Sequence, residues 1–203
     1  MGEPQKADYH TIEEYLQREE LNSFKSEYEN GSILAMSGAS AVHNRINGNI
    51  FIKISALIDG EDRTCEAYIN DLKVFVEEAN SFVYPDVVVV CGEEQFSEHD
   101  KDALVNPLLI IEVLSSSTGN YDRGSKFLTY ASLKSLREYV LIDQYQPFVE
   151  VRYRSEAESD WGMKVFTGLD KVVEFRSLNV EVLMEDIYRR VENLFSPNLR
   201  IDR

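Results

Sequence analysis

The stretch Leu108-Leu-Ile-Ile-Glu-Val-Leu114 places one acidic residue, Glu112, inside an otherwise apolar run. Apolar runs of this length are typical of strands that are buried on both faces of a sheet. An unpaired ionised carboxylate in such a strand would cost several kcal/mol. We therefore expect Glu112 to face a cation, a hydrogen-bonding partner or an open cleft.

A second acid, Asp86, opens the apolar run Pro85-Asp-Val-Val-Val-Val-Cys91. Pro85 stands at the start of this predicted strand, where a missing backbone N–H does little harm. If the two runs form adjacent strands, the carboxylates of Asp86 and Glu112 converge. Such a pair suits Mg²⁺, which prefers oxygen ligands and keeps open positions for water and substrate phosphate.

Lys126 is the alternative cation for these carboxylates. Residues 122–133 are expected to form a helix on which Asp122, Lys126 and Tyr130 follow one another at intervals of four and so share one face. That face can return over the end of the sheet and bring the lysine to the acids. A lysine beside a bound metal indicates phosphodiester hydrolysis, because both cations stabilise negative charge on a phosphate.

The remaining pattern predicts an α+β (α/β) fold with an N-terminal helix and hairpin. Thr11 and Glu14 have the spacing of a capping box for a helix over 12–21, and Asn30-Gly31 fits the turn of a hairpin. Apolar residues recur at helical spacing from 42 to 58. Further strands are expected at 65–69, 72–77, 82–91, 108–114, 139–143, 148–154 and 163–167, and a closing helix at 181–191. Short turns between several strands favour a mixed sheet flanked by helices over a doubly wound parallel sheet.

Composition indicates a single domain over residues 1–203 and restricts its partners. The formal charge is −15, and residues 1–100 carry 20 acidic against 7 basic side chains. This balance excludes binding of nucleic acid by a general basic surface, because neutralised phosphates supply most non-specific affinity. Two dispersed cysteines, Cys65 and Cys91, indicate core thiols in a reduced, cytoplasmic protein. The apolar runs are far shorter than a membrane span, so no membrane partner is expected.

Several segments together resemble the Uma2 family of restriction-endonuclease-like proteins, within the PD-(D/E)XK nuclease superfamily. The resemblance covers about 9–154, between a polar tail at 1–8 and C-terminal strands and a helix at 155–203. The segments that carry it are Tyr28-Glu-Asn-Gly-Ser-Ile33, the helix containing His43, Asp71-Leu-Lys-Val74, Tyr84-Pro-Asp-Val87, Ile111-Glu-Val-Leu-Ser115 and Lys126 to Tyr130. Their order and spacing are more specific than any one of them.

The resemblance implies that Asp86 and Glu112 are the metal-binding acids of a catalytic site. Leu114 stands where the superfamily usually has its lysine, two residues after the glutamate, so the resemblance makes Lys126 the replacement. Glu29 resembles an additional catalytic acid. Residues typical of the family also stand at three accessory positions, which are His43, Asp71 and Tyr130.

The function implied is Mg²⁺-dependent hydrolysis of DNA, with Mn²⁺ as a substitute ion and a homodimer as the working form. Because of the overall acidity, we expect DNA binding to be weak, local and metal-assisted. Leu114 also supports an alternative, a binding or assembly module that keeps the nuclease fold without hydrolysis. A phosphodiesterase acting on RNA or a small substrate is a third interpretation, since it needs no large basic groove.

Overall fold

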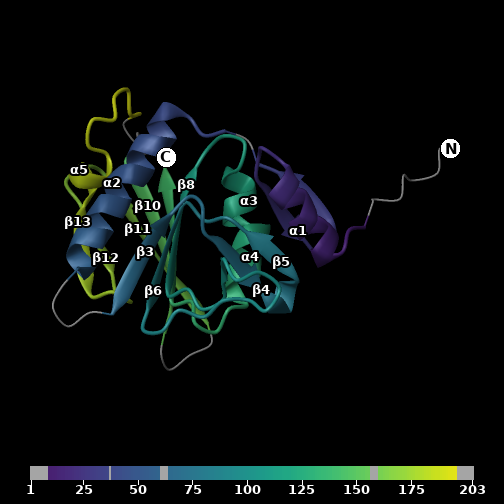
Figure 1. The fold of residues 1–203 in the computed structure, drawn as a ribbon. Coiled ribbons are helices and arrows are strands. Elements are labelled where there is room, and N and C mark those ends of the chain that lie inside the picture. Colours follow the sequence, from purple (N-terminus) through teal and green to yellow (C-terminus); the bar gives the residue numbers. More distant parts are fainter. Residues whose placement is uncertain (1–8, 37, 60–63, 156–159, 196–203) are drawn as a thin grey trace.

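A six-stranded sheet forms the middle layer of the computed structural model, which describes residues 9–36, 38–59, 64–155 and 160–195 (Figure 1). Its strand order is β11-β10-β9-β8-β6-β3, with β8 and β9 parallel and the other neighbours antiparallel. The strands are β3 (Cys65–Ile69), β6 (Val87–Cys91), β8 (Leu109–Leu114), β9 (Glu138–Asp143), β10 (Phe148–Arg154) and β11 (Trp161–Thr167). The sheet is therefore mixed, as the turn lengths predict.

Both faces of this sheet are covered, which explains why its central strands are continuously apolar. Val87 and Val89 of β6 face helix α2 (Ala41–Ile58), whereas Val88 and Val90 face the opposite layer. Helix α2 contributes a buried stripe at helical spacing, made of Ile46, Ile50, Ile54 and Ile58. The alternation fixes the direction of every side chain in the strand, since a shift of one residue would exchange the faces.

The second layer is a five-stranded sheet of order β2-β1-β5-β4-β7. Its strands are β1 (Ser26–Glu29), β2 (Ser32–Ala35), β4 (Lys73–Val76), β5 (Ser81–Val83) and β7 (Ala103–Leu104), with the short 3-10 helix η1 (Glu77–Ala79) between β4 and β5. Helix α1 (Ile12–Leu21) packs on this sheet through Tyr15, and its predicted capping box with Thr11 and Glu14 is present. The predicted hairpin is confirmed, since Asn30 and Gly31 both have positive φ.

Two predicted elements are each broken by a residue that the backbone cannot continue through. The expected strand 82–91 is two strands in different sheets, β5 and β6, because Tyr84-Pro85-Asp86 crosses between the layers and Pro85 has no N–H for a ladder. The expected helix 122–133 is two short helices, α3 (Gly119–Arg123) and α4 (Ser125–Ala131). They meet at Gly124, whose φ of −105° and ψ of −103° are not helical.

The predicted closing helix at 181–191 is confirmed over only a short part of that range. Val180–Leu183 is instead strand β13, which pairs antiparallel with β12 (Val172–Phe175), and only the short helix α5 (Met184–Ile187) follows. Burial alternates here with the period of a strand, since Val182 and Met184 are buried whereas Glu181 and Leu183 are exposed. This hairpin and α5 pack beside α2 on the same face of the large sheet (Figure 1).

Cys65 and Cys91 form a disulfide, which corrects the prediction of two core thiols. They lie directly opposite each other in the antiparallel pair β3 and β6. The expectation of a fully reduced chain fails because strand register brings together two residues that are 26 positions apart. The polar tail predicted at 1–8 lies outside the described residues.

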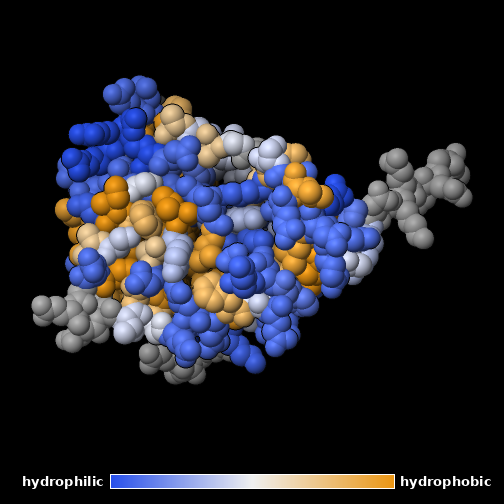
Figure 2. Space-filling view, in the orientation of Figure 1, coloured by the Kyte–Doolittle hydropathy of each residue, from blue (hydrophilic) through white to orange (hydrophobic). Residues whose placement is uncertain are grey.

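Apolar side chains also reach the surface of the α2 layer. Ile52 and Leu57 of α2 are exposed, and Figure 2 shows apolar side chains gathered over α2 and β3 on the face it presents. Within the described ranges, no helix is both long and apolar enough to cross a membrane.

Candidate active site

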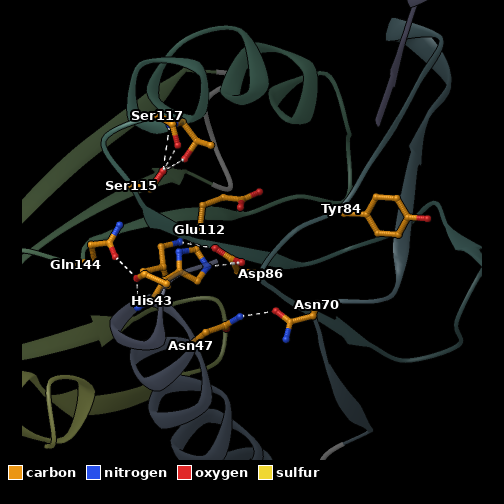
Figure 3. A network of polar contacts seen from close by, with 12 residues as sticks. His43, Asn47, Asn70, Tyr84, Asp86, Glu112, Ser115, Ser117 and Gln144 are labelled. Atoms are coloured by element: carbon orange, nitrogen blue, oxygen red, sulfur yellow. Dashed lines mark hydrogen bonds and ion pairs between the residues drawn. The ribbon is translucent and has the colours of Figure 1, made fainter. Parts of the chain in front are cut away.

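Asp86 lies at the crossing between the two sheets and is held by two other elements (Figure 3). Its Oδ2 accepts a hydrogen bond of 2.7 Å from the backbone N–H of Val113 on β8. Its Oδ1 lies 2.9 Å from Nε2 of His43, in the first turn of α2. His43 and β8 therefore fix the orientation of this carboxylate where β6 begins and β8 ends, at one end of the inner strands of the large sheet.

Glu112 extends from β8 into the same cleft as Asp86 and meets the cation that the helix spacing predicts. Its Oε1 lies 2.9 Å from Nζ of Lys126 on α4 and 3.4 Å from the hydroxyl of Tyr130, which lies one turn further on. Glu112 and Lys126 are each only 4% exposed. The structure thus brings Lys126 and Tyr130 to Glu112 and His43 to Asp86, and it places both carboxylates in one cleft.

Lys126 uses all three of its ammonium hydrogens on protein acceptors. Besides Glu112, Nζ contacts Oε1 of Glu27 at 3.0 Å and the carbonyl oxygen of Tyr84 at 3.1 Å. These acceptors come from β8, from β1 and from the crossing that precedes Asp86. Lys126 therefore ties both sheets to α4, a structural task that the sequence does not reveal.

Glu27 belongs to the site although the sequence pattern does not predict it. Its Oε1 also accepts a 3.0 Å hydrogen bond from the N–H of Tyr84, and its Oε2 accepts one of 2.9 Å from the Tyr121 hydroxyl. The predicted acid, Glu29, contacts the same hydroxyl but not Lys126. Because side chains alternate along a strand, Glu27 and Glu29 share a face of β1, and this period of two was the available signal.

Asp71 does not join the carboxylates of Asp86 and Glu112. It forms an ion pair with Lys25, and its side chain is 79% exposed. The Lys25 ammonium also donates to the carbonyl of Asn70 at 3.2 Å. Asp71 therefore lies at the rim of the site, where Lys25 contacts both its carboxylate and the turn that follows β3.

The buried charges at the site are not balanced. Burial raises the pKa of Glu112 well above its ordinary value, Lys126 opposes this shift, and the neighbouring charge of Asp86 adds to it. Burial also raises the pKa of Asp122, the next acid around Lys126. Burial lowers the pKa of Lys126, but Glu112, Glu27 and Asp122 outweigh it and raise that pKa well above its ordinary value. Lys126 is thus a permanent cation surrounded by more acids than it can neutralise.

The raised pKa values mean that Glu112 and Asp122 hold protons more readily than exposed acids do, and a divalent cation beside them would take the place of those protons. The described part of the chain has no cluster of three or more His, Cys, Asp or Glu residues arranged for a metal. Asp86 and Glu112 are two carboxylates, a number that Mg²⁺ accepts while it keeps several waters. Asp86 also raises the pKa of Glu112, so a cation between the two would relieve their mutual repulsion. Both line an open cleft of about 890 Å³.

Comparison with known proteins identifies relatives of this chain. The model of the Uma2 family, described as "Putative restriction endonuclease", matches residues 12–184. Two proteins of Synechocystis sp. (strain ATCC 27184 / PCC 6803 / Kazusa) are similar over most of their length. The uncharacterised protein sll1609 is 38% identical over 84% of this chain and 94% of its own, and the uncharacterised protein slr1290 is 33% identical over 87% and 90%.

A solved structure shares the fold. The crystal structure of a "putative nuclease belonging to DUF820" from Anabaena variabilis ATCC 29413 superimposes with a TM-score of 0.69, covering 88% of this chain and 97% of that one at 21% identity. The predicted fold class is therefore confirmed: the chain has a mixed α+β, restriction-endonuclease-like nuclease fold.

Proposed function

Because the chain belongs to the Uma2 family of restriction-endonuclease-like proteins, we propose that it is a Mg²⁺-dependent endonuclease that hydrolyses phosphodiester bonds in DNA. One observation carries the proposal: Asp86, Glu112 and Lys126, which are far apart in sequence, line one cleft at the edge of the large sheet. Buried carboxylates beside a buried lysine are costly to fold, and such groups concentrate at functional sites.

Asp86 and Glu112 are the residues that would hold the metal ion. When bound, Mg²⁺ would lower the pKa of a water ligand and neutralise charge on the phosphate. His43 acts on Asp86, since its contact at Oδ1 and the Val113 N–H at Oδ2 set the plane of the carboxylate. His43 is therefore proposed as a positioning residue.

Lys126 is proposed to stabilise negative charge on the phosphate and not to remove a proton. The acids around it keep its pKa well above its ordinary value, so it remains an ammonium ion at physiological pH. A fixed cation next to the reacting phosphate favours the transition state, where negative charge increases. Glu27 and the Tyr84 carbonyl hold Nζ in place for this role.

The second candidate function is a binding or assembly module without hydrolysis. The observation that favours it is the complete use of the Lys126 ammonium by Glu27, Glu112 and Tyr84, which leaves no hydrogen for a substrate until one contact is exchanged. Metal dependence separates the two candidates.

The test combines cleavage with metal binding. Supercoiled plasmid and linear DNA are incubated with the protein in Mg²⁺, Mn²⁺ or EDTA, and Mg²⁺ binding is measured by calorimetry. We expect nicking in Mg²⁺ or Mn²⁺ only, and loss of at least a hundredfold in rate for Asp86→Asn and for Glu112→Gln. Glu174→Gln is the control, since Glu174 pairs with Lys164 on the C-terminal strands. Absence of Mg²⁺ binding at millimolar concentration would leave the module as the better description.

A further inference from the structure

The groups proposed to act on the phosphodiester lie at the floor of the cleft and not on an open surface. Glu112 and Lys126 are 4% exposed, and the Asp86 side chain is 18% exposed. A phosphate must therefore enter the cleft to reach them. The cleft volume of about 890 Å³ is that of a pocket for a small ligand, in the range of roughly 300–1,000 Å³, and is suited to a few nucleotides of one strand.

The cleft carries few positive charges with which to hold a duplex. Among its described lining residues the lysines are Lys25 and Lys126, and no arginine is present. Lys25 is paired with Asp71, and Lys126 is engaged at the floor. The acids of the lining are Glu27, Asp71, Asp86, Glu112 and Asp122. Affinity for both duplexes and single strands depends on neutralised phosphates, but this dependence is steeper for a duplex, so this lining disfavours a duplex more than a single strand.

The cleft instead exposes apolar side chains on its walls. Phe24, Leu34, Met36 and Tyr145 are each 38% to 56% exposed, although large apolar groups are usually covered. They come from the turn before β1, from β2 and its end, and from the turn between β9 and β10. Aromatic side chains in such positions stack on unpaired bases, whose faces are covered by their neighbours in a duplex.

We propose that the cleft binds an unpaired DNA strand, with bases against Phe24 and Tyr145 and a phosphate at Asp86, Glu112 and Lys126. The proposal rests on the proposed nuclease function for its phosphate position and names the substrate class of that site. Hydroxyl groups of the loop Ser115, Ser116 and Ser117, which also lines the cleft, supply hydrogen bonds to the strand. Stacking replaces the basic surface that this acidic chain lacks.

The test measures binding separately from cleavage. Asp86→Asn is titrated in Mg²⁺ against fluorescein-labelled single strands and duplexes of one sequence, and anisotropy gives the Kd. We expect the single strand to bind at least tenfold more tightly than the duplex. Phe24→Ala and Tyr145→Ala, each added to Asp86→Asn, are expected to weaken single-strand binding about tenfold.

Two matched variants control for the ring and for surface changes in general. Tyr145→Phe keeps the ring and should bind as before, and Leu128→Ala removes an apolar side chain that is 69% exposed but outside the cleft lining. Equal binding of duplex and single strand, tighter binding of RNA, or no effect of either alanine variant would overturn the inference. In that case, cleavage of duplex DNA by the wild type would still support the nuclease function. Selective binding of single strands by Asp86→Asn, together with no cleavage of any DNA by the wild type, would overturn the nuclease function alone.

Discussion

Replacement of Lys126 by methionine should destabilise the protein strongly and in a pH-dependent way. Methionine keeps most of the apolar stem but removes the ammonium that Glu27, Glu112 and the Tyr84 carbonyl share. Removing one partner of a buried ion pair typically costs about 3–5 kcal/mol, because the other charge stays buried without compensation. For a chain of this size that corresponds to a fall in Tm of about 6–20 °C.

The pH dependence follows from the raised pKa of Glu112. A carboxyl whose folded pKa lies above its unfolded value contributes stability at low pH and loses it as pH rises through the folded pKa. Burial already raises the pKa of Glu112 in the wild type, and Lys126 opposes that shift. Without Lys126 the shift grows, so the deficit of Lys126→Met should be largest at pH 8 and smaller at pH 5.

Urea unfolding followed by far-UV circular dichroism at pH 5 and pH 8 measures both quantities. The double variant Lys126→Met with Glu112→Gln should recover at least about 1 kcal/mol relative to Lys126→Met, because one uncompensated charge is gone. A deficit below about 1 kcal/mol at pH 8 would refute the argument, since surface lysines lose no more than that. Equal deficits at both pH values would show that packing, not charge, was lost.

Three further outcomes follow from the same contacts. The unfolding free energy of the metal-free wild type should fall between pH 5 and pH 8, and that of Glu112→Gln should fall less; parallel pH profiles for variant and wild type would contradict the raised pKa of Glu112. Glu27→Gln should lower the unfolding free energy by about 1–3 kcal/mol, and Glu29→Gln by less, as thermal melts can compare; the reverse order would restore Glu29 as the important acid. Reduction of the Cys65–Cys91 disulfide should release two thiols in a colorimetric assay under denaturing conditions and cost about 2–4 kcal/mol, whereas free thiols before reduction would contradict the bond.

Local signals in the sequence predict the elements that they govern. The capping box starts α1 at Ile12, the Asn30-Gly31 pair makes the first hairpin, and the isoleucines of α2 predict its buried face. These features depend on residues within one or two turns of each other, so a single sequence contains them completely.

The errors occur where distant packing decides. Pro85 and Gly124 are residues that often interrupt a strand or a helix, so the sequence indicates both breaks. The direction of the chain after each break depends on the layers that it joins. Val180–Leu183 is too short for its pattern to distinguish the period of a strand from that of a helix, and its pairing with β12 makes it a strand. The register of β3 and β6 likewise brings Cys65 opposite Cys91.

The sequence predicts the kinds of chemical group in the candidate site better than it predicts which residues supply them. A charged residue in a doubly buried strand has few explanations, which is why Glu112 identifies the site and Lys126 follows from helix spacing. Glu27 could not be preferred over Glu29 without knowing which end of β1 approaches α4. The Asp86 carboxylate accepts its hydrogen bond from the backbone N–H of Val113, and because every residue type other than proline has such an N–H, no side chain in the sequence predicts this contact.

Because Tyr84-Pro85-Asp86 crosses between the two sheets, the geometry of the site depends on the packing of one sheet against the other. Lys126 contacts the Tyr84 carbonyl and Glu27 on one side of this crossing. Asp86 contacts His43 and the backbone of β8 on the other side. Subglobal unfolding that released the β1–β2 hairpin would detach Glu27 while the six-stranded core and its hydrogen-exchange protection persisted. The contacts among Glu27, Lys126 and Glu112 would then be lost at a lower temperature than the secondary structure. Activity and secondary structure would therefore have separate melting curves.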